Sequence, residues 1–177
     1  VMGWVKPNSI SGSDVLLHRN NFGVAGFEVY MNTSAGLGLS TAGQYFEKGS
    51  ALPDNTWSFF CIKRVGTTAY MYINGEQVNS TGNSANLSVN LPLTIGNDAS
   101  KNNPFSGSLA LFRISGTAPS AEQIAKIYND EKVLFQENAQ ATLYGTSDAV
   151  TALAYDDTTE LFHVGTSAGR SVFQGLR

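Results

Sequence analysis

The sequence WSFFCIKRVGTTAYMYINGEQV, residues 57–78, decides the fold of this chain. Its first half is an apolar run with strand character, and in its second half Ala69, Met71 and Ile73 alternate with two tyrosines. Such alternation places successive side chains on opposite faces of a β-strand. Asn74-Gly75 follows at once and favours a two-residue type I′ turn, because both of its positions need a positive φ. The segment therefore predicts an antiparallel hairpin over residues 68–78.

Similar strand patterns recur along most of the chain. Their spacing of about 8–12 residues is typical of a β-sandwich or a β-barrel. Strands are predicted over residues 1–6, 15–18, 26–31, 36–40, 57–65, 68–73, 76–78, 91–95 and 108–115. In residues 26–32, Phe27, Val29 and Met31 share one face. The buried residues are predicted to include Trp4, Phe27, Val29, Phe60, Ile62, Met71, Ile73, Ile95, Leu109 and Leu111.

Composition and charge exclude several classes of protein. Of the 177 residues, 14% are charged and 11% are aromatic, which fits neither a coiled coil nor a disordered chain. The net charge of −3 comes without a basic cluster, so neither nucleic acid nor an anionic membrane is an expected partner. No apolar run reaches the roughly 18 residues of a transmembrane helix. Because Val1 already opens a strand-like segment, we expect this chain to be part of a longer parent chain.

One helix is expected after the series of strands. Ser120 and Gln123 have the spacing of a capping box at a helix N-terminus. Ile124, Ile127 and Tyr128 then share one face, at the i, i+3 and i+4 positions. The pattern predicts a helix over about residues 120–135 that packs on one sheet or seals its edge.

The C-terminal residues change character and predict a second region. We divide the chain into residues 1–137 and residues 138–177, and we expect the latter to form a three-strand β meander. Its apolar residues are predicted to occupy both faces: Val150, Leu153, Tyr155, Leu161, Phe162, Val164, Val172 and Phe173. Soluble monomers avoid such exposed apolar patches. We therefore expect the meander to be an assembly element, covered by other subunits or by further parent-chain sequence.

Four pieces of residues 1–130, in this order, resemble a known family. They are Gly3-Trp4-Val5-Lys6-Pro7, the hairpin region 57–78, Pro92-Leu93-Thr94-Ile95-Gly96-Asn97, and residues 105–114 with the helix from Ser120 to Tyr128. Together they resemble the laminin-G-like, pentraxin-like branch of the concanavalin A-like jelly rolls. The resemblance implies an all-β fold: a two-sheet antiparallel jelly-roll sandwich with one closing helix, whose rim loops carry any ligand. Members include glycan binders, adhesion modules and inert spacers, so the fold does not set the function.

The run from residue 137 to residue 176 also resembles C-terminal segments of large structural proteins of marine bacteriophages. This resemblance implies a non-enzymatic structural or binding module of a phage virion, as a fibre, tail or head decoration protein. Its expected partners are other virion subunits, in a homo-oligomer, and host surface glycans. The alternative is a secreted, extracellular carbohydrate-binding module of a bacterium, similar to a lectin. A third, enzymatic alternative is a glycoside hydrolase.

No residue pattern predicts catalysis. Glucanases with this jelly roll carry Glu-x-Asp-x-x-Glu on one strand, and this chain has no such run. Asp156, Asp157 and Glu160 come nearest, and they are interpreted as turn residues. His18 and His163 are too isolated from other ligands for a zinc site. The single cysteine, Cys61, is interpreted as a small buried hydrophobe, and no cofactor is expected.

One loop, residues 96–103, is rich in oxygen donors, and the resemblance places it at the rim of the sandwich. Calcium binds about six to eight oxygen ligands, which makes Asp98 and Asn97 candidate calcium ligands. The loop holds a single carboxylate, and Lys101 opposes a cation, so an ordinary polar loop is the other interpretation. The family often has an acidic pair where this chain has Ala110-Leu111, which weakens the expectation of calcium.

Sugar binding usually needs an exposed aromatic ring beside amide groups. Tyr45 is the candidate ring, and Asn102 and Asn103 are the candidate amides. Tyr70 and Tyr72 share a strand face and are further candidates. If the helix covers that face, the two tyrosines are structural instead.

Overall fold

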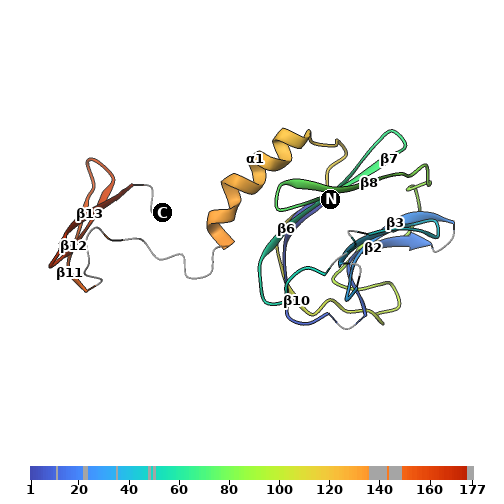
Figure 1. Ribbon diagram of the computed structural model, residues 1–177, viewed down its shortest axis with the longest axis horizontal. Helices are drawn as coiled ribbons and strands as arrows, with labels where there is room; N and C mark the ends of the chain where they lie inside the picture. Colours follow the sequence, from blue (N-terminus) through green and yellow to red (C-terminus); the bar gives the residue numbers. More distant parts are fainter. Residues whose placement is uncertain are drawn as a thin grey trace. The chain divides into compact units, whose positions relative to one another are not determined.

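The computed structural model describes residues 1–10, 12–21, 24–34, 36–47, 49, 51–135, 143 and 149–174. The chain divides into two compact units, Val1–Gln136 and Glu137–Arg177. The first unit contains β1 (Met2–Pro7), β2 (Ser13–Asn21), β3 (Ala25–Asn32), β4 (Gly36–Thr41), β5 (Gln44–Glu47), β6 (Ser58–Val65), β7 (Thr68–Ile73), β8 (Glu76–Gly82), β9 (Thr94–Ile95), β10 (Gly107–Arg113), α1 (Ala121–Glu131) and the 3₁₀ helix η1 (Lys132–Phe135). The second contains β11 (Val150–Asp156), β12 (Leu161–Thr166) and β13 (Gly169–Gln174) (Figure 1).

Two five-stranded antiparallel sheets make up the first unit. One has the strand order β10-β1-β6-β7-β8 and the other has the order β5-β4-β3-β2-β9. Because strands distant in sequence, such as β1 and β10, pair within one sheet, the chain crosses repeatedly between the two layers. The prediction of an all-β, two-sheet antiparallel sandwich is confirmed.

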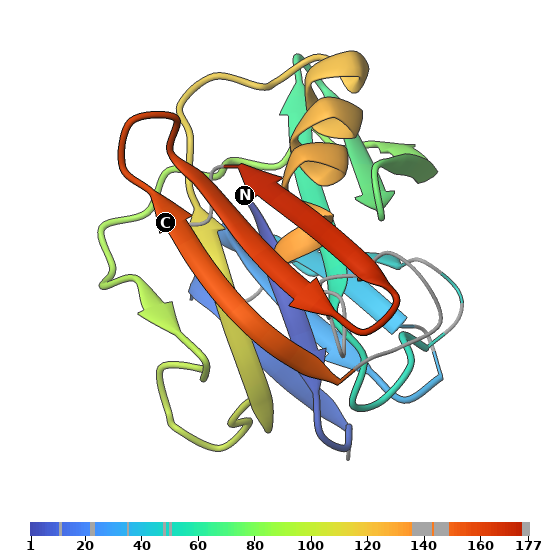
Figure 2. The same cartoon turned by 90° about the vertical axis from the view of Figure 1, so that its left-hand side faces the viewer.

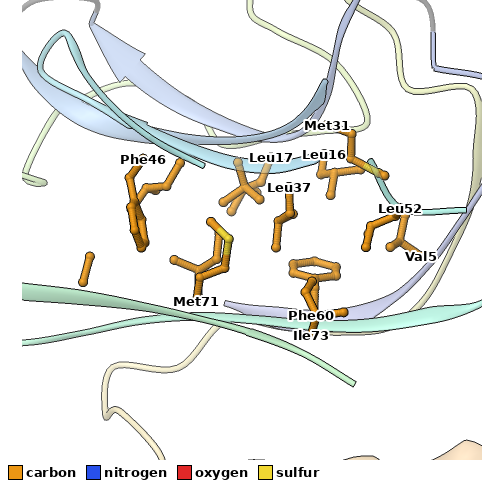
Figure 3. Packing of buried hydrophobic residues seen from close by; sticks show 14 residues of the cluster. Val5, Leu16, Leu17, Met31, Leu37, Phe46, Leu52, Phe60, Met71 and Ile73 are labelled. Carbon is orange, nitrogen blue, oxygen red and sulfur yellow. The ribbon is translucent and has the colours of Figure 1, made fainter. Parts of the chain in front are cut away.

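The main hydrophobic core lies between these two sheets. Figure 3 shows Leu17, Met31 and Leu37 of one sheet directed towards Phe60 and Met71 of the other. These five side chains are at most 1% exposed. At about 25 cal/mol per Å² of apolar surface removed from water, this layer is the main source of stability of the unit.

The predicted hairpin forms over β7 and β8. Asn74 and Gly75 have φ values of 50° and 83°, the left-handed conformation that a type I′ turn requires at both positions. The side-chain oxygen of Asn74 accepts a 2.9 Å hydrogen bond from the backbone N–H of Phe59, which ties the turn to β6. The identity of these two turn residues thus fixes the hairpin.

A second cluster lies between the β10-β1-β6-β7-β8 sheet and α1. Ser120 and Gln123 form the predicted capping box at the start of this helix. Ile124 is 0% exposed and packs in a cluster with Met2, Trp4, Phe59, Cys61 and Tyr72. Trp4 stacks on Phe135 at 4.2 Å between ring centroids and donates a 2.8 Å hydrogen bond to Glu131. The helix therefore covers the outer face of this sheet. No helix in the described part of the chain is long and apolar enough to cross a membrane.

Several details of the prediction are wrong. Ile95 and Leu111, which were predicted to be buried, are 54% and 41% exposed. Ile95 lies on a two-residue strand at the edge of its sheet, and the predicted strand over residues 91–95 shortens to β9. Leu111 has a φ of 46°, so its side chain departs from the alternation of its strand. Phe27 and Leu109 are partly buried at the margin of the core, and β5 was not predicted.

The second unit is the predicted three-strand meander, with the order β11-β12-β13 (Figure 2, orange to red). The register pairs Leu153 with Val164 and Tyr155 with Phe162, and Phe162 with Phe173. Since residues directly opposite each other share a face, these five side chains lie together. Leu161 and Val172 lie on the other face, beside His163 and Arg170. The predicted apolar residues thus occupy both faces but gather mainly on one, which we call the aromatic face of the meander.

Candidate ligand-binding groove

The outer face of the β5-β4-β3-β2-β9 sheet is polar. Alternation sends Val29 and Leu39 into the core and leaves the side chains between them on the opposite face. Two cross-strand rows build this face. One runs His18, Glu28, Ser40, Tyr45, and the other runs Tyr30, Gly38, Glu47.

Tyr30 and Glu47 form the floor of a groove on this face, and Gly38 supports the Tyr30 ring from beneath. The Tyr30 ring lies over Gly38, where a Cβ would approach its Cζ to 2.3 Å. This leaves the hydroxyl of Tyr30 free to donate a 2.6 Å hydrogen bond to Oε1 of Glu47, one strand further on. Burial, and then the hydrogen bond and charge of Glu47, raise the pKa of Tyr30 well above its ordinary value. The hydroxyl therefore stays protonated and continues to orient the Glu47 carboxylate.

A buried pair stands beside this floor. Nδ1 of His18 lies 2.7 Å from Oε2 of Glu28, and the two residues are 2% and 7% exposed. A carboxylate removed from water in this way needs such a donor. This contact agrees with the interpretation of His18 as a structural residue. It orients the Glu28 carboxylate, which lines the groove.

The 96–103 loop is organised by Asp98 and Asn97. The two carboxylate oxygens of Asp98 accept hydrogen bonds from the backbone N–H of Asn102 at 2.9 Å and the side-chain amide of Asn103 at 2.7 Å. Asn97 Oδ1 accepts from the backbone N–H groups of Asp98 and Asn103. Burial acts to raise the pKa of Asp98, but these hydrogen bonds, with the nearby His18, hold it below its ordinary value. Both predicted calcium ligands thus use their oxygens to close the loop.

The predicted calcium site remains a prediction. Within the described ranges, no three His, Cys, Asp or Glu side chains gather closely enough to hold a metal ion. A cation at Asp98 would have to displace hydrogen bonds that the loop already makes. The geometry therefore favours the interpretation as an ordinary polar loop.

The groove has a volume of about 270 Å³. Its walls combine the sheet face with the end of the 96–103 loop; the lining residues are Ser13, Glu28, Tyr30, Asn32, Tyr45, Glu47 and Asn103. Tyr45 is 68% exposed. The structure thus brings two of the predicted ligand-binding residues, Tyr45 and Asn103, to one groove, whereas Asn102 contributes to the loop behind it.

Sequence reasoning missed Glu28, Tyr30 and Glu47. A signal for the first two was present, since the alternation of Phe27, Val29 and Met31 already placed Glu28 and Tyr30 on the opposite face. Glu47 lies on a strand that was not predicted. Only the register of three strands shows that these side chains meet.

The other candidate residues are structural. Tyr72 is 2% exposed beneath α1, and the Lys63 ammonium lies over both tyrosine rings, 5.6 Å from the centroid of Tyr70 and 5.0 Å from that of Tyr72. Cys61 is fully buried, and this burial raises the pKa of its thiol. Asp156 accepts hydrogen bonds from Thr158 and Thr159 in the β11–β12 turn, as expected of a turn residue.

A second hollow, of about 340 Å³, opens at one end of the sandwich. Its walls are mainly apolar and include Phe27, Val29, Leu39 and Ile62. This hollow is lined by residues at the margin of the core, and its lining does not include an exposed aromatic ring like that of Tyr45 in the groove.

Comparison with solved structures shows that several other domains share this fold. A candidate carbohydrate-binding protein from Bacteroides ovatus superposes with a TM-score of 0.61 at 14% identity, over 99% of this chain and 53% of that chain. The Ruminococcus gnavus IT-sialidase CBM40 bound to α2,3 sialyllactose gives 0.56 at 15% identity, over 72% and 80%. A heptameric SAP-like pentraxin from Limulus polyphemus gives 0.57 at 15% identity, over 99% and 82%.

These identities are low, so the superpositions show a shared fold alone. The chain spans about half the length of the Bacteroides ovatus protein. No curated protein sequence shows significant similarity to it. Residues 1–125, however, match the family Laminin_G_3, described as the concanavalin A-like lectin/glucanases superfamily. Because this match covers most of the chain, the protein belongs to the Laminin_G_3 family of the concanavalin A-like lectin/glucanases superfamily.

Proposed function

We propose that this chain is a non-enzymatic carbohydrate-binding module whose ligand occupies the groove beside Tyr45. The observation that carries the proposal is this ring, which stands 68% exposed at a groove lined with hydroxyl, amide and carboxylate groups. A sugar presents an apolar face to such a ring and hydroxyls to the polar groups around it. The preformed floor of Tyr30 and Glu47 limits the entropy lost on binding.

The comparisons support a binding module. The superfamily is named for lectins as well as glucanases, and the Ruminococcus gnavus module is bound to a glycan. Neither fact assigns a ligand to this chain, so the groove has to be tested directly.

The test is a glycan array followed by calorimetric titration of the glycans that bind. Tyr45→Ala should weaken binding by about fivefold or more, because stacking on an aromatic ring contributes about 1 kcal/mol or more. Tyr45→Phe keeps the ring and should retain most of the affinity. Val65→Ala is the control, since Val65 is 54% exposed at the end of β6 in the other sheet.

Two results would contradict the proposal. If Tyr45→Ala binds glycans as tightly as the wild type, the ligand does not lie in the groove. If bound oligosaccharides are cleaved during incubation, the module is an enzyme, and the glycoside hydrolase alternative applies.

We further propose that the module is part of a phage virion fibre, tail or head decoration protein and that the meander joins it to other copies. The resemblance of residues 137–176 to phage structural proteins supports this setting. The aromatic face supports the role in assembly. Leu153 and Tyr155 on this face are 63% and 56% exposed, and Tyr155, Phe162 and Phe173 line a hollow of about 210 Å³. Isolated sheets with such a face and two open edges associate with further chains.

Charge placed on each face in turn tests this assembly. Leu153→Glu, on the aromatic face, should convert an oligomer into monomers in sedimentation analysis. Val172→Glu is the matched control, because Val172 is 43% exposed on the opposite face. A chain that ends at Asn138 should also be monomeric. If the wild type is itself a monomer, the meander is no assembly element, and the alternative of a secreted bacterial lectin-like module is favoured.

A further inference from the structure

The described lining of the groove carries negative charge and includes no cationic side chain. Two of its seven lining residues, Glu28 and Glu47, are acidic, and the five others are neutral and polar. Both carboxylates act on Tyr30 between them: after burial, the charges of Glu47 and Glu28 contribute to raising its pKa. The field of the two carboxylates therefore converges on the groove floor.

Among the described charged side chains, none forms an ion pair with Glu47. His18 is engaged with Glu28. On the loop side stands Asp98, a third carboxylate, next to the groove residue Asn103. Arg19 donates from its Nε to the backbone oxygen of Leu91, and it does not line the groove. Lys101 is an exposed loop residue outside the lining.

We propose that the groove selects glycans by charge: it favours sugars that bear a protonated amine and rejects sugars that bear a carboxylate. This inference rests on the proposed glycan-binding function. An ammonium group near Glu47 gains a charge-assisted hydrogen bond in a partly desolvated site. A sugar carboxylate in the same place would face the like charge of Glu47, and the described lining offers it no cation to pair with.

Glu47 is the residue that confers this selectivity. Its Oε1 is held by the hydroxyl of Tyr30, which fixes the direction of the carboxylate towards a ligand stacked on Tyr45, two residues away on the same strand and face. Glu28 contributes charge, but its Oε2 is engaged with buried His18. The shared fold of the sialyllactose-bound module therefore does not carry sialic-acid binding to this chain.

The experiment is calorimetric titration of the full chain with three oligosaccharides. They are a glucosamine tetramer at a pH where its amines are protonated, the N-acetylglucosamine tetramer, and 3′-sialyllactose. The glucosamine tetramer should bind about tenfold tighter than the acetylated one, which corresponds to about 1.4 kcal/mol, and sialyllactose should not bind. Raising the salt from about 20 mM to about 300 mM should reduce the preference, because exposed charges are screened.

Two variants and a peptide distinguish recognition of an amino sugar from non-specific attraction between opposite charges. Glu47→Gln keeps an acceptor for Tyr30 and should remove most of the preference for the amine, whereas Glu76→Gln, on β8 of the other sheet, should keep it. A tetralysine peptide carries similar charge without a sugar ring, and it should bind at least tenfold more weakly than the glucosamine tetramer.

Four results would overturn the inference. They are equal or tighter binding of the acetylated tetramer, binding of sialyllactose as tight as that of neutral sugars, an undiminished preference in Glu47→Gln, and binding of tetralysine as tight as that of the sugar. In each case sugar binding that depends on Tyr45 would leave the proposed function standing. If no glycan binds the wild type, both proposals fail.

Discussion

Replacing Gly38 by alanine tests how the floor of the groove is built. A Cβ at residue 38 would lie 2.3 Å from Cζ of Tyr30, well inside van der Waals contact. Because Tyr30 is only 4% exposed, its ring has to move away from the sheet to make room. That movement also separates its hydroxyl from Glu47, which accepts its hydrogen bond at 2.6 Å.

Three contributions set the expected change in the free energy of unfolding. Forcing an extra group into a packed site costs about 1–3 kcal/mol. Loss of a hydrogen bond to a charged group costs about 1.5–3 kcal/mol. Alanine is favoured over glycine in a strand by roughly 0.5–1 kcal/mol, which opposes both losses. The net destabilisation is about 3 kcal/mol, or roughly 9 °C in Tm for a chain of this size.

The assay is urea unfolding followed by tryptophan fluorescence, since Trp4 and Trp57, the two tryptophans of the chain, both lie in the first unit. Gly38→Ala is measured in the wild type and again in a Tyr30→Ala background. Without the ring, the added methyl group meets no obstacle, and the substitution should be neutral or stabilising by less than about 1 kcal/mol. If Gly38→Ala is equally costly in both backgrounds, the Tyr30 ring is not the obstacle, and the description of the floor is wrong.

The remaining predictions concern the helix and the loop. Ile124→Ala removes a fully buried side chain and should lower the free energy of unfolding by about 2–4 kcal/mol. Ser120→Ala removes the helix cap and should lower it by about 1 kcal/mol. An Ile124 variant that melts like the wild type would show that α1 is not docked. Asp98 has a folded-state pKa below its ordinary value of 3.8, so its ionised form stabilises the fold. The stability difference between the wild type and Asp98→Asn, measured by urea unfolding, should be complete above about pH 5 and shrink as the pH falls further, and a difference that grew in acid would refute this. Millimolar calcium should change Tm by less than about 1 °C, because the Asp98 oxygens are occupied, whereas a rise that increases with calcium concentration would place the ion there.

Much of the fold could be predicted because its signals are local. Asn74-Gly75 fixes a turn through the φ values that these two residues tolerate. Ser120 and Gln123 cap a helix through hydrogen bonds within one turn of the chain. Alternation in the meander predicted its three strands. Each of these signals acts over a few residues, so no knowledge of distant contacts was needed.

The candidate site could be predicted only in part. Tyr45 and Asn103 were predicted because their chemistry suits a sugar. Other tyrosines were predicted on the same ground but do not line the groove, because their surroundings differ. Tyr70 and Tyr72 alternate as regularly as the groove residues do, yet their face of the sheet lies under α1. Which outer face is covered depends on where the helix docks, and that depends on the fit of Ile124 among side chains of other strands.

By itself, the sequence determined most of the strands, where the tightest turn and the helix start lie, and that the chain has the composition of a β-sandwich. The tertiary structure alone decided that Glu28, Tyr30 and Glu47 meet in one groove, because that meeting depends on the register of three strands. It also decided that Asp98 closes its own loop, since the donors it accepts from are positioned by the folded loop. The difference is physical: φ preferences and capping bonds act between neighbours in sequence, whereas a groove is made by side chains that only packing brings together.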